Sequence, residues 1–103
     1  MMREARILNH GIYAGLLIDT EEGGYEFVYD TNYQGPPISL TMPVAKQRFV
    51  FKKFPPFFDG LLPEGMLLEA LLKNAKIDRN DLFSQLVTVG KDLVGSVTVD
   101  GET

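Results

Sequence analysis

The hydrophobic pattern of this chain changes its period once, and this change limits the folds that the chain can adopt. Up to Phe51, apolar residues often alternate with polar ones, as in residues 25–30, which is the period of a half-buried strand. After Pro63, apolar residues recur three and four positions apart, which is the period of a helix with one buried face. The pattern therefore predicts a β half followed by an α half.

The β half predicts a small sheet built from short strands. Turn residues separate the apolar segments, notably Asn9-His10-Gly11 and the polar residues 21–24. We expect a final strand over residues 93–99 to return to this sheet, because its apolar side chains need cover. The other expected extended segments are residues 3–8, 12–19, 25–30, 38–42 and 49–51, with Ile38, Leu40 and Met42 on one apolar face.

The α half predicts two helices. The first carries a stripe of Leu67, Leu68, Leu71 and Leu72, which we expect to be buried in the core. The second carries Leu82, Phe83, Leu86 and Val87, with Asp78 as its expected N-cap, Asp81 three residues later, and Gly90 just beyond its end. The fold class is therefore α+β: one domain over residues 1–103, with a mostly antiparallel sheet of five or six strands and two helices in the C-terminal half.

Residues 57–65, Phe-Phe-Asp-Gly-Leu-Leu-Pro-Glu-Gly, lie where the period changes. Asp59-Gly60 is a turn dipeptide, because glycine tolerates a positive φ. Pro63 suits the first turn of a helix, where its missing N–H costs nothing, and Glu64 suits the positive end of the helix dipole. The segment predicts a corner between a strand and a helix.

Few residues have the chemistry for catalysis. The one histidine, His10, lies in a turn, and the pair Asp59 and Glu64 is explained by the corner. The glycines around Lys91 lack the order of a phosphate-binding loop. The chain has no cysteine, which excludes a thiolate metal site. We expect no catalytic, cofactor-binding or metal-binding residue and no enzymatic activity.

Charge and hydropathy also exclude some partners. The formal net charge is −4 and the isoelectric point is about 4.8, whereas nucleic-acid binding needs a basic surface. No apolar run approaches the ~20 residues that cross a membrane, and the first residues lack the apolar core of a signal peptide. We therefore expect a cytoplasmic protein that binds neither nucleic acid nor membrane.

Several segments together resemble one family. Residues 57–65 resemble the Phe-Phe-x-x-Leu-Leu-Pro-Glu-Gly signature of the N-terminal subdomain of HipA, the kinase toxin of bacterial toxin–antitoxin modules. Residues 12–16, 27–30, 38–43 and 89–97 resemble further segments of that subdomain, in the same order. The chain contains neither a His-Arg-Asp-like loop nor an Asp-Phe-Gly-like motif, so it lacks the kinase core. It is most similar to HipS, the small antitoxin of tripartite HipBST modules.

The resemblance implies a function and a partner. It implies an antitoxin that binds and inhibits a HipA-like (HipT-type) serine/threonine kinase, in a complex that also contains a DNA-binding HipB-type protein. Inhibition by blocking the cleft and by holding the kinase inactive both stay open. The alternative is a structural or activating subunit, or a detached N-terminal subdomain of such a kinase. The expected kinase-binding residues are Phe57, Phe58, Asp59, Leu61, Leu62, Pro63, Glu64 and Met66.

Overall fold

The computed structural model describes residues 3–20, 22–93 and 95–101. Its strands form one antiparallel sheet in the order β4-β3-β2-β1-β5. The expected α+β class is confirmed, and a short helix, α1, precedes the two expected helices. Along the chain the elements are β1 (Arg3–Asn9), β2 (Ile12–Asp19), β3 (Tyr25–Tyr29), the 3-10 turn η1 (Val44–Lys46), β4 (Arg48–Phe51), α1 (Pro56–Asp59), α2 (Gly65–Ala75), α3 (Leu82–Val89) and β5 (Val97–Gly101).

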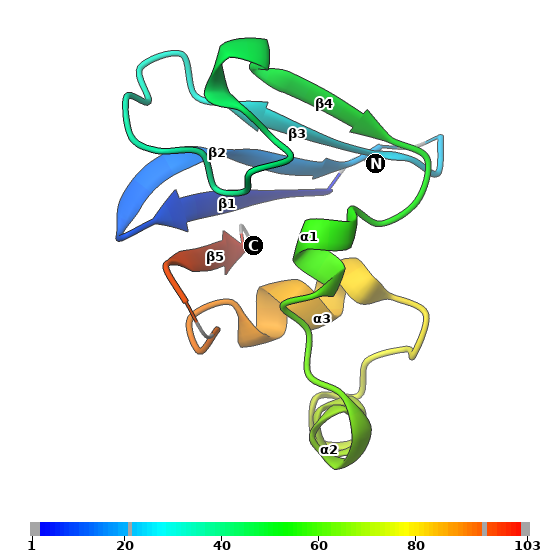
Figure 1. The fold of residues 1–103 in the computed structure, drawn as a ribbon. Coiled ribbons are helices and arrows are strands. Elements are labelled where there is room, and N and C mark those ends of the chain that lie inside the picture. The colour runs from blue at the N-terminus through cyan, green and yellow to red at the C-terminus, as the bar shows by residue number, and fades with distance from the viewer. Residues whose placement is uncertain (1–2, 21, 94, 102–103) are drawn as a thin grey trace.

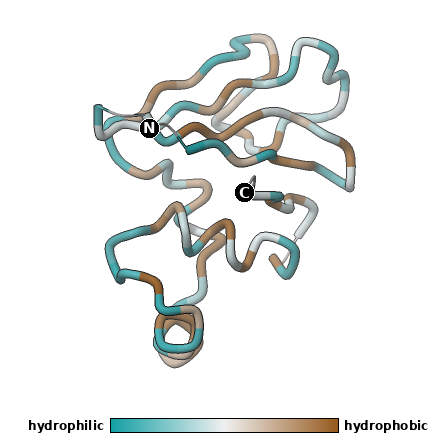
Figure 2. Tube along the Cα trace, turned by 180° about the vertical axis from the view of Figure 1, so that it is seen from behind, coloured by the Kyte–Doolittle hydropathy of each residue, from teal (hydrophilic) through white to brown (hydrophobic). Residues whose placement is uncertain are grey.

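The core lies between one face of the sheet and the helices α1 and α3. Figure 1 shows these two helices close to the sheet, whereas α2 lies furthest from it. Hydrophobic and hydrophilic residues alternate along the strands, as Figure 2 shows. The inward side chains include Ile7, Leu17, Phe27 and Tyr29, and they meet Phe58 of α1 and Phe83 and Leu86 of α3. The alternation in the sequence therefore buries one face of the sheet, as expected.

Tyr29 fixes the long connection between β3 and β4. Its buried hydroxyl donates to the carbonyl of Met42 at 2.6 Å and accepts from the backbone N–H of Ile38 at 3.0 Å. Ile38 and Met42 are buried, but Leu40 is 97% exposed, and the segment forms turns. The expectation of an extended segment with all three side chains on one face was therefore wrong, because Tyr29 holds the backbone in a looped path.

We predict that Tyr29→Phe lowers the free energy of unfolding by about 1–3 kcal/mol, because it leaves two buried backbone groups without a partner. Chemical denaturation measures this change. The matched control is Tyr25→Phe, since the Tyr25 hydroxyl has no hydrogen bond to another described residue and its ring keeps its contact with Phe54. Equal losses in the two variants would show that the hydroxyl of Tyr29 does not hold the loop.

The N-terminus of α3 is tied to the sheet by a charged cluster. Asp81 is the N-cap and accepts from the backbone N–H of Ser84 at 3.2 Å. The guanidinium of Arg3 pairs with Asp81 at 3.1 Å and with Asp19 at 2.5 Å. The expected N-cap, Asp78, instead accepts from the N–H of Asn80 in the preceding turn. The helix therefore begins three residues later than expected. Asp81 has a partner in Arg3, which is distant in sequence and could not be inferred from the residues next to Asp81.

Asp81→Ala should cost about 0.5–2 kcal/mol, the usual effect of losing an N-cap. Burial raises the pKa of Asp81, but the hydrogen bonds from Ser84 and the charge of Arg3 outweigh it and hold the pKa below its ordinary value. A lowered folded-state pKa gives stability that is present above the unfolded-state value and is lost as the pH falls through the folded-state value. The difference in melting temperature between wild type and variant should therefore become smaller as the pH is lowered from neutral to acidic. Asp92→Ala, an exposed carboxylate, is the control.

Candidate partner-binding surface

The corner at residues 57–65 contains most of the short helix α1 and the first residue of α2, whereas a single helix start was expected. Pro56 occupies the first turn of α1, and Gly60 ends that helix. Glu64 is the extended N-cap of α2, so it lies at the positive end of the helix dipole. Pro63 lies outside the helix, and its expected placement in the first turn was wrong. Gly65 has a φ of 58°, a value that favours glycine over residues with a Cβ. The chain therefore turns sharply at Gly65 and directs α2 away from the sheet.

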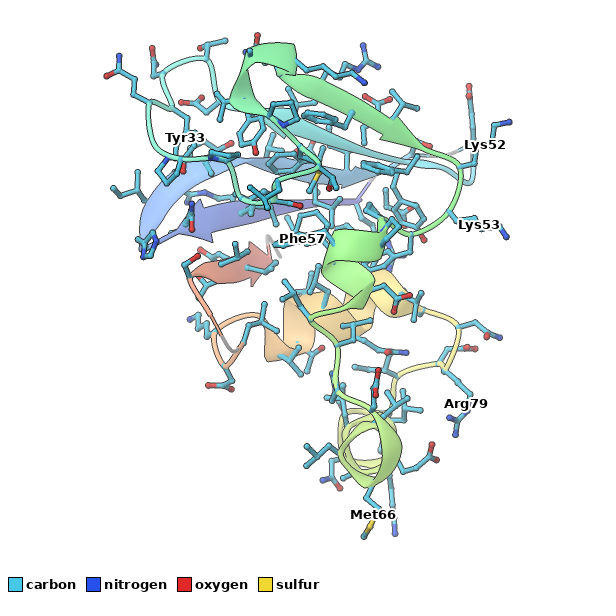
Figure 3. All side chains as sticks on the ribbon, in the orientation of Figure 1. Tyr33, Lys52, Lys53, Phe57, Met66 and Arg79 are labelled. Carbon is cyan, nitrogen blue, oxygen red and sulfur yellow. The ribbon has the colours of Figure 1, made fainter. Side chains whose placement is uncertain are left out.

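Helix α2 is the least buried α-helix of the described chain. None of its residues is fully buried; Met66 is 88% exposed and Leu67 is 73% exposed. Figure 3 shows Met66 pointing away from the rest of the molecule. The expected burial of the leucine stripe was therefore wrong, and Leu71 is only partly buried. Leu71→Ala should consequently cost less than the 2–5 kcal/mol of a fully buried leucine.

A bidentate ion pair links α2 to the connection before α3. Both terminal nitrogens of Arg79 donate to the carboxylate of Glu69 at 2.7 Å. These bonds hold the pKa of Glu69 below its ordinary value. Planar pairing of this kind fixes geometry, although exposed charges add little stability. The pair thus orients a helix that otherwise lies at the edge of the molecule.

An apolar groove of about 700 Å³ lies between α2, the corner and the end of α3. Leu61, Leu62 and Pro63 form the side contributed by the corner, and Leu67 and Leu71 form the side contributed by α2. The remaining wall comes from the end of α3 and the residues after it: Val89, Asp92 and Leu93. We call these residues, with Gly60, the α2 groove. Contiguous apolar surface of this kind is typical of a site that contacts another protein or a ligand.

The structure separates the eight expected kinase-binding residues. Leu61, Leu62 and Pro63 line the α2 groove, while Asp59, Glu64 and Met66 are exposed around it. Phe57 borders a different hollow, beside β4, and Phe58 is fully buried against Phe27. The side chain of Phe58 therefore belongs to the core. Sequence reasoning missed Leu67, Leu71 and Leu93 as surface residues, because it assigned the first two to the core and the third to a strand that in fact begins at Val97.

The comparison with protein-family models decides the family. The model of the HipA N-terminal domain matches residues 5–100, which is nearly the whole chain. The chain belongs to the HipA N-terminal domain family. A solved structure described as the N-terminal domain of HipA toxin agrees, with a TM-score of 0.77 and 29% identity over 98% of this chain and 93% of that one.

Two relatives of this HipA N-terminal domain differ in how much of their own length the match covers. An uncharacterised protein of Haemophilus influenzae is 31% identical over 99% of this chain, and the match covers 95% of its own length. The putative kinase Y4dM of Sinorhizobium fredii is also 31% identical, over 87% of this chain, but the match covers only 24% of the kinase. The chain thus spans nearly the whole length of the Haemophilus influenzae protein but only about a quarter of the length of Y4dM.

Other site types have little support in the described parts of the HipA N-terminal domain. No group of three or more His, Asp or Glu side chains within residues 3–20, 22–93 and 95–101 could hold a metal ion. No helix in these ranges is long and apolar enough to cross a membrane. The α2 groove is the feature that most clearly offers contact area to a partner.

Proposed function

We propose that this HipA N-terminal domain is an antitoxin of the HipS type, which binds a HipA-like (HipT-type) serine/threonine kinase and inhibits it. The observation that carries the proposal is the α2 groove, an apolar surface on a domain whose kinase relative Y4dM extends far beyond the matched region. Faces between domains of one chain bury roughly 600–1,500 Å² and are more polar than permanent interfaces. The exposed carboxylates of Asp59 and Glu64 beside the leucines suit such a face.

The domain would inhibit the kinase by binding to it and would catalyse no reaction itself. Leu67 and Met66 would enter the kinase surface, and Leu61 and Leu62 would form the hollow that receives a kinase side chain. From this site the domain could block the cleft of the kinase or hold its glycine-rich loop in an inactive arrangement. We place the complex in the cytoplasm, together with a DNA-binding HipB-type protein.

Co-expression separates inhibition from its alternative, an activating or structural subunit. The experiment pairs this chain with a HipA-type kinase that lacks an N-terminal domain of its own, and it measures growth and autophosphorylation of the purified kinase. An antitoxin restores growth and suppresses phosphorylation in a dose-dependent way. An activating subunit makes the kinase toxic only when both are present, and that result would reject our proposal.

Binding is measured in the same system by calorimetry. The purified chain alone, incubated with ATP and Mg²⁺, should transfer no phosphate, since the sequence lacks the loops that hold nucleotide and metal in kinases. Phosphoryl transfer by the chain free of kinase would contradict a non-catalytic role. Absence of binding to kinases of this type would contradict the proposed partner.

A further inference from the structure

The outer edge of β4 is a free strand edge. β4 is the last strand of the sheet, and no strand among the described residues pairs with its other side. The N–H of Tyr29 donates to the carbonyl of Gln47, and the antiparallel register pairs Phe27 with Phe49 and Glu26 with Val50. Since hydrogen-bonded and non-hydrogen-bonded pairs alternate in such a ladder, Val50 directs its backbone N–H and C=O away from β3.

A second hollow runs beside this edge. It has a volume of about 410 Å³ and is separate from the α2 groove, with which it shares no residue. Phe49 and Phe51 of β4 form its floor together with Met42, while Pro55, Pro56 and Phe57 close its far side. A strand added to β4 would place every second side chain into this apolar hollow, because side chains alternate between the faces of a sheet.

Basic side chains lie along the same edge: Arg48 and Lys52 alternate with the phenylalanines of β4, whereas Lys46 lies over the ring of Phe49 on the side of the hollow. Four of the ten Lys and Arg residues of this acidic chain lie within residues 46–53, and no Asp or Glu lies between Asp30 and Asp59. Arg48 pairs with Glu26, but Lys52 and Lys53 make no ion pair with a described residue. Figure 3 shows both lysines projecting outward beyond the end of β4. The edge thus combines an apolar hollow on one face with unpaired positive charge near its end.

We propose that the β4 edge binds an extended peptide segment of a partner protein, in which apolar residues alternate with Asp or Glu. The segment would join the sheet as a sixth strand through the free backbone groups of Arg48, Val50 and Lys52. Its apolar side chains would fill the hollow lined by Phe49, Phe51 and Phe57, and its carboxylates would face the basic side chains. This inference is independent of the kinase that we propose for the α2 groove.

Two other occupants fit the edge less well. A second copy of this chain would bring two basic β4 edges together, and like charges on paired strands destabilise the pairing. Nucleic acid binds to basic surfaces with aromatic rings open for stacking, whereas Phe49 is buried and Phe51 is partly buried. Lysines on edge strands also discourage aggregation, but that role does not require an apolar hollow beside them.

The test uses isotope-labelled protein and a short, end-capped synthetic peptide in which valine and glutamate alternate. We expect saturable binding by NMR titration, with the amide signals of Arg48, Val50 and Lys52 shifting most. The amide of Val50 should gain protection from hydrogen exchange in the complex, because it acquires an acceptor. A peptide that alternates valine with lysine, and one that alternates serine with glutamate, should each bind at least about tenfold more weakly.

Charge reversal provides the second arm of the test. Lys52→Glu/Lys53→Glu should weaken binding of the acidic peptide about tenfold. The same change at the C-terminal end of α2, Lys73→Glu/Lys76→Glu, should leave the affinity within about twofold. Equal weakening by both double variants, or binding without protection of Val50, would overturn the proposal. So would failure of the peptide to bind at millimolar concentration, concentration-dependent dimerisation through β4 in sedimentation, or preferential binding of single-stranded DNA in place of the peptide.

Discussion

Phe58→Ala should lower the free energy of unfolding by about 3–5 kcal/mol, the usual cost of removing a fully buried phenylalanine. Phe58 is completely buried, and its ring lies 6.0 Å from that of Phe27 and 5.2 Å from that of Phe57. Its side chain packs α1 against the sheet. The substitution would therefore leave a cavity under α1, just before the chain continues to α2. A domain of this size has a total stability of roughly 5–15 kcal/mol, so the loss is a large fraction of it.

Thermal unfolding measures this loss directly. A midpoint lowered by at least about 12 °C is expected, since each kcal/mol corresponds to roughly 4–8 °C in a domain of this size. The control is Leu40→Ala, a residue that is 97% exposed and should change stability by less than about 0.5 kcal/mol. If Leu40→Ala lowered the midpoint as much as Phe58→Ala, the side chain of Leu40 would have to be packed in the core. That result would contradict the looped path of residues 38–42.

The sheet was predictable because alternation is a local signal. The strands over residues 12–19 and 25–29 lie where the pattern places them, and the hairpin residues between them join neighbouring antiparallel strands. The segment from Ile38 to Met42 shows the same alternation, yet it forms turns. The difference is the hydroxyl of Tyr29, which binds both ends of the segment and is distant in sequence. Periodicity cannot report a contact of this kind.

Helix α2 was predicted as a helix but misplaced in the fold. Its leucine spacing gives the correct structure, since spacing reports local geometry. Spacing does not report which partner covers the apolar face, and in the described chain that face is only partly covered. The family signature includes Leu61, Leu62 and Pro63, which line the groove, whereas Leu67 and Leu93 are recognised as groove residues only from the positions of the corner and α3.

The position of Gly90 at the end of α3 was predicted, but the reason for a glycine there was not. It lies just past the second helix, as expected, but its φ is −55°, so the left-handed conformation that usually favours glycine at a helix end is absent. A Cβ at this position would lie 2.2 Å from the carbonyl oxygen of Val99, while the N–H of Val99 donates to the carbonyl of Gly90 at 2.9 Å. The glycine is therefore required by the close passage of β5, a contact between the end of α3 and the last strand.

Leu67→Asp should weaken binding to the proposed kinase at least about hundredfold. Leu67 lines the α2 groove and is 73% exposed, so in the complex the variant would place an unpaired carboxylate in an apolar contact, which costs several kcal/mol. The variant should still fold, because no packed contact is lost and an acidic residue in the first turn of a helix suits its dipole. Calorimetry gives the affinity, and circular dichroism checks the fold.

The comparison with two further variants locates the contact. Leu40→Asp makes the same chemical change at an exposed leucine in the β3–β4 connection, and it should leave kinase affinity within about twofold. Met66→Asp, at the exposed tip of α2, separates a contact over the groove from a contact at the helix end. A larger loss for Leu67→Asp than for Met66→Asp would assign the kinase side chain to the groove. Full affinity in both α2 variants, with intact folding, would remove α2 from the interface and reject the surface that we propose.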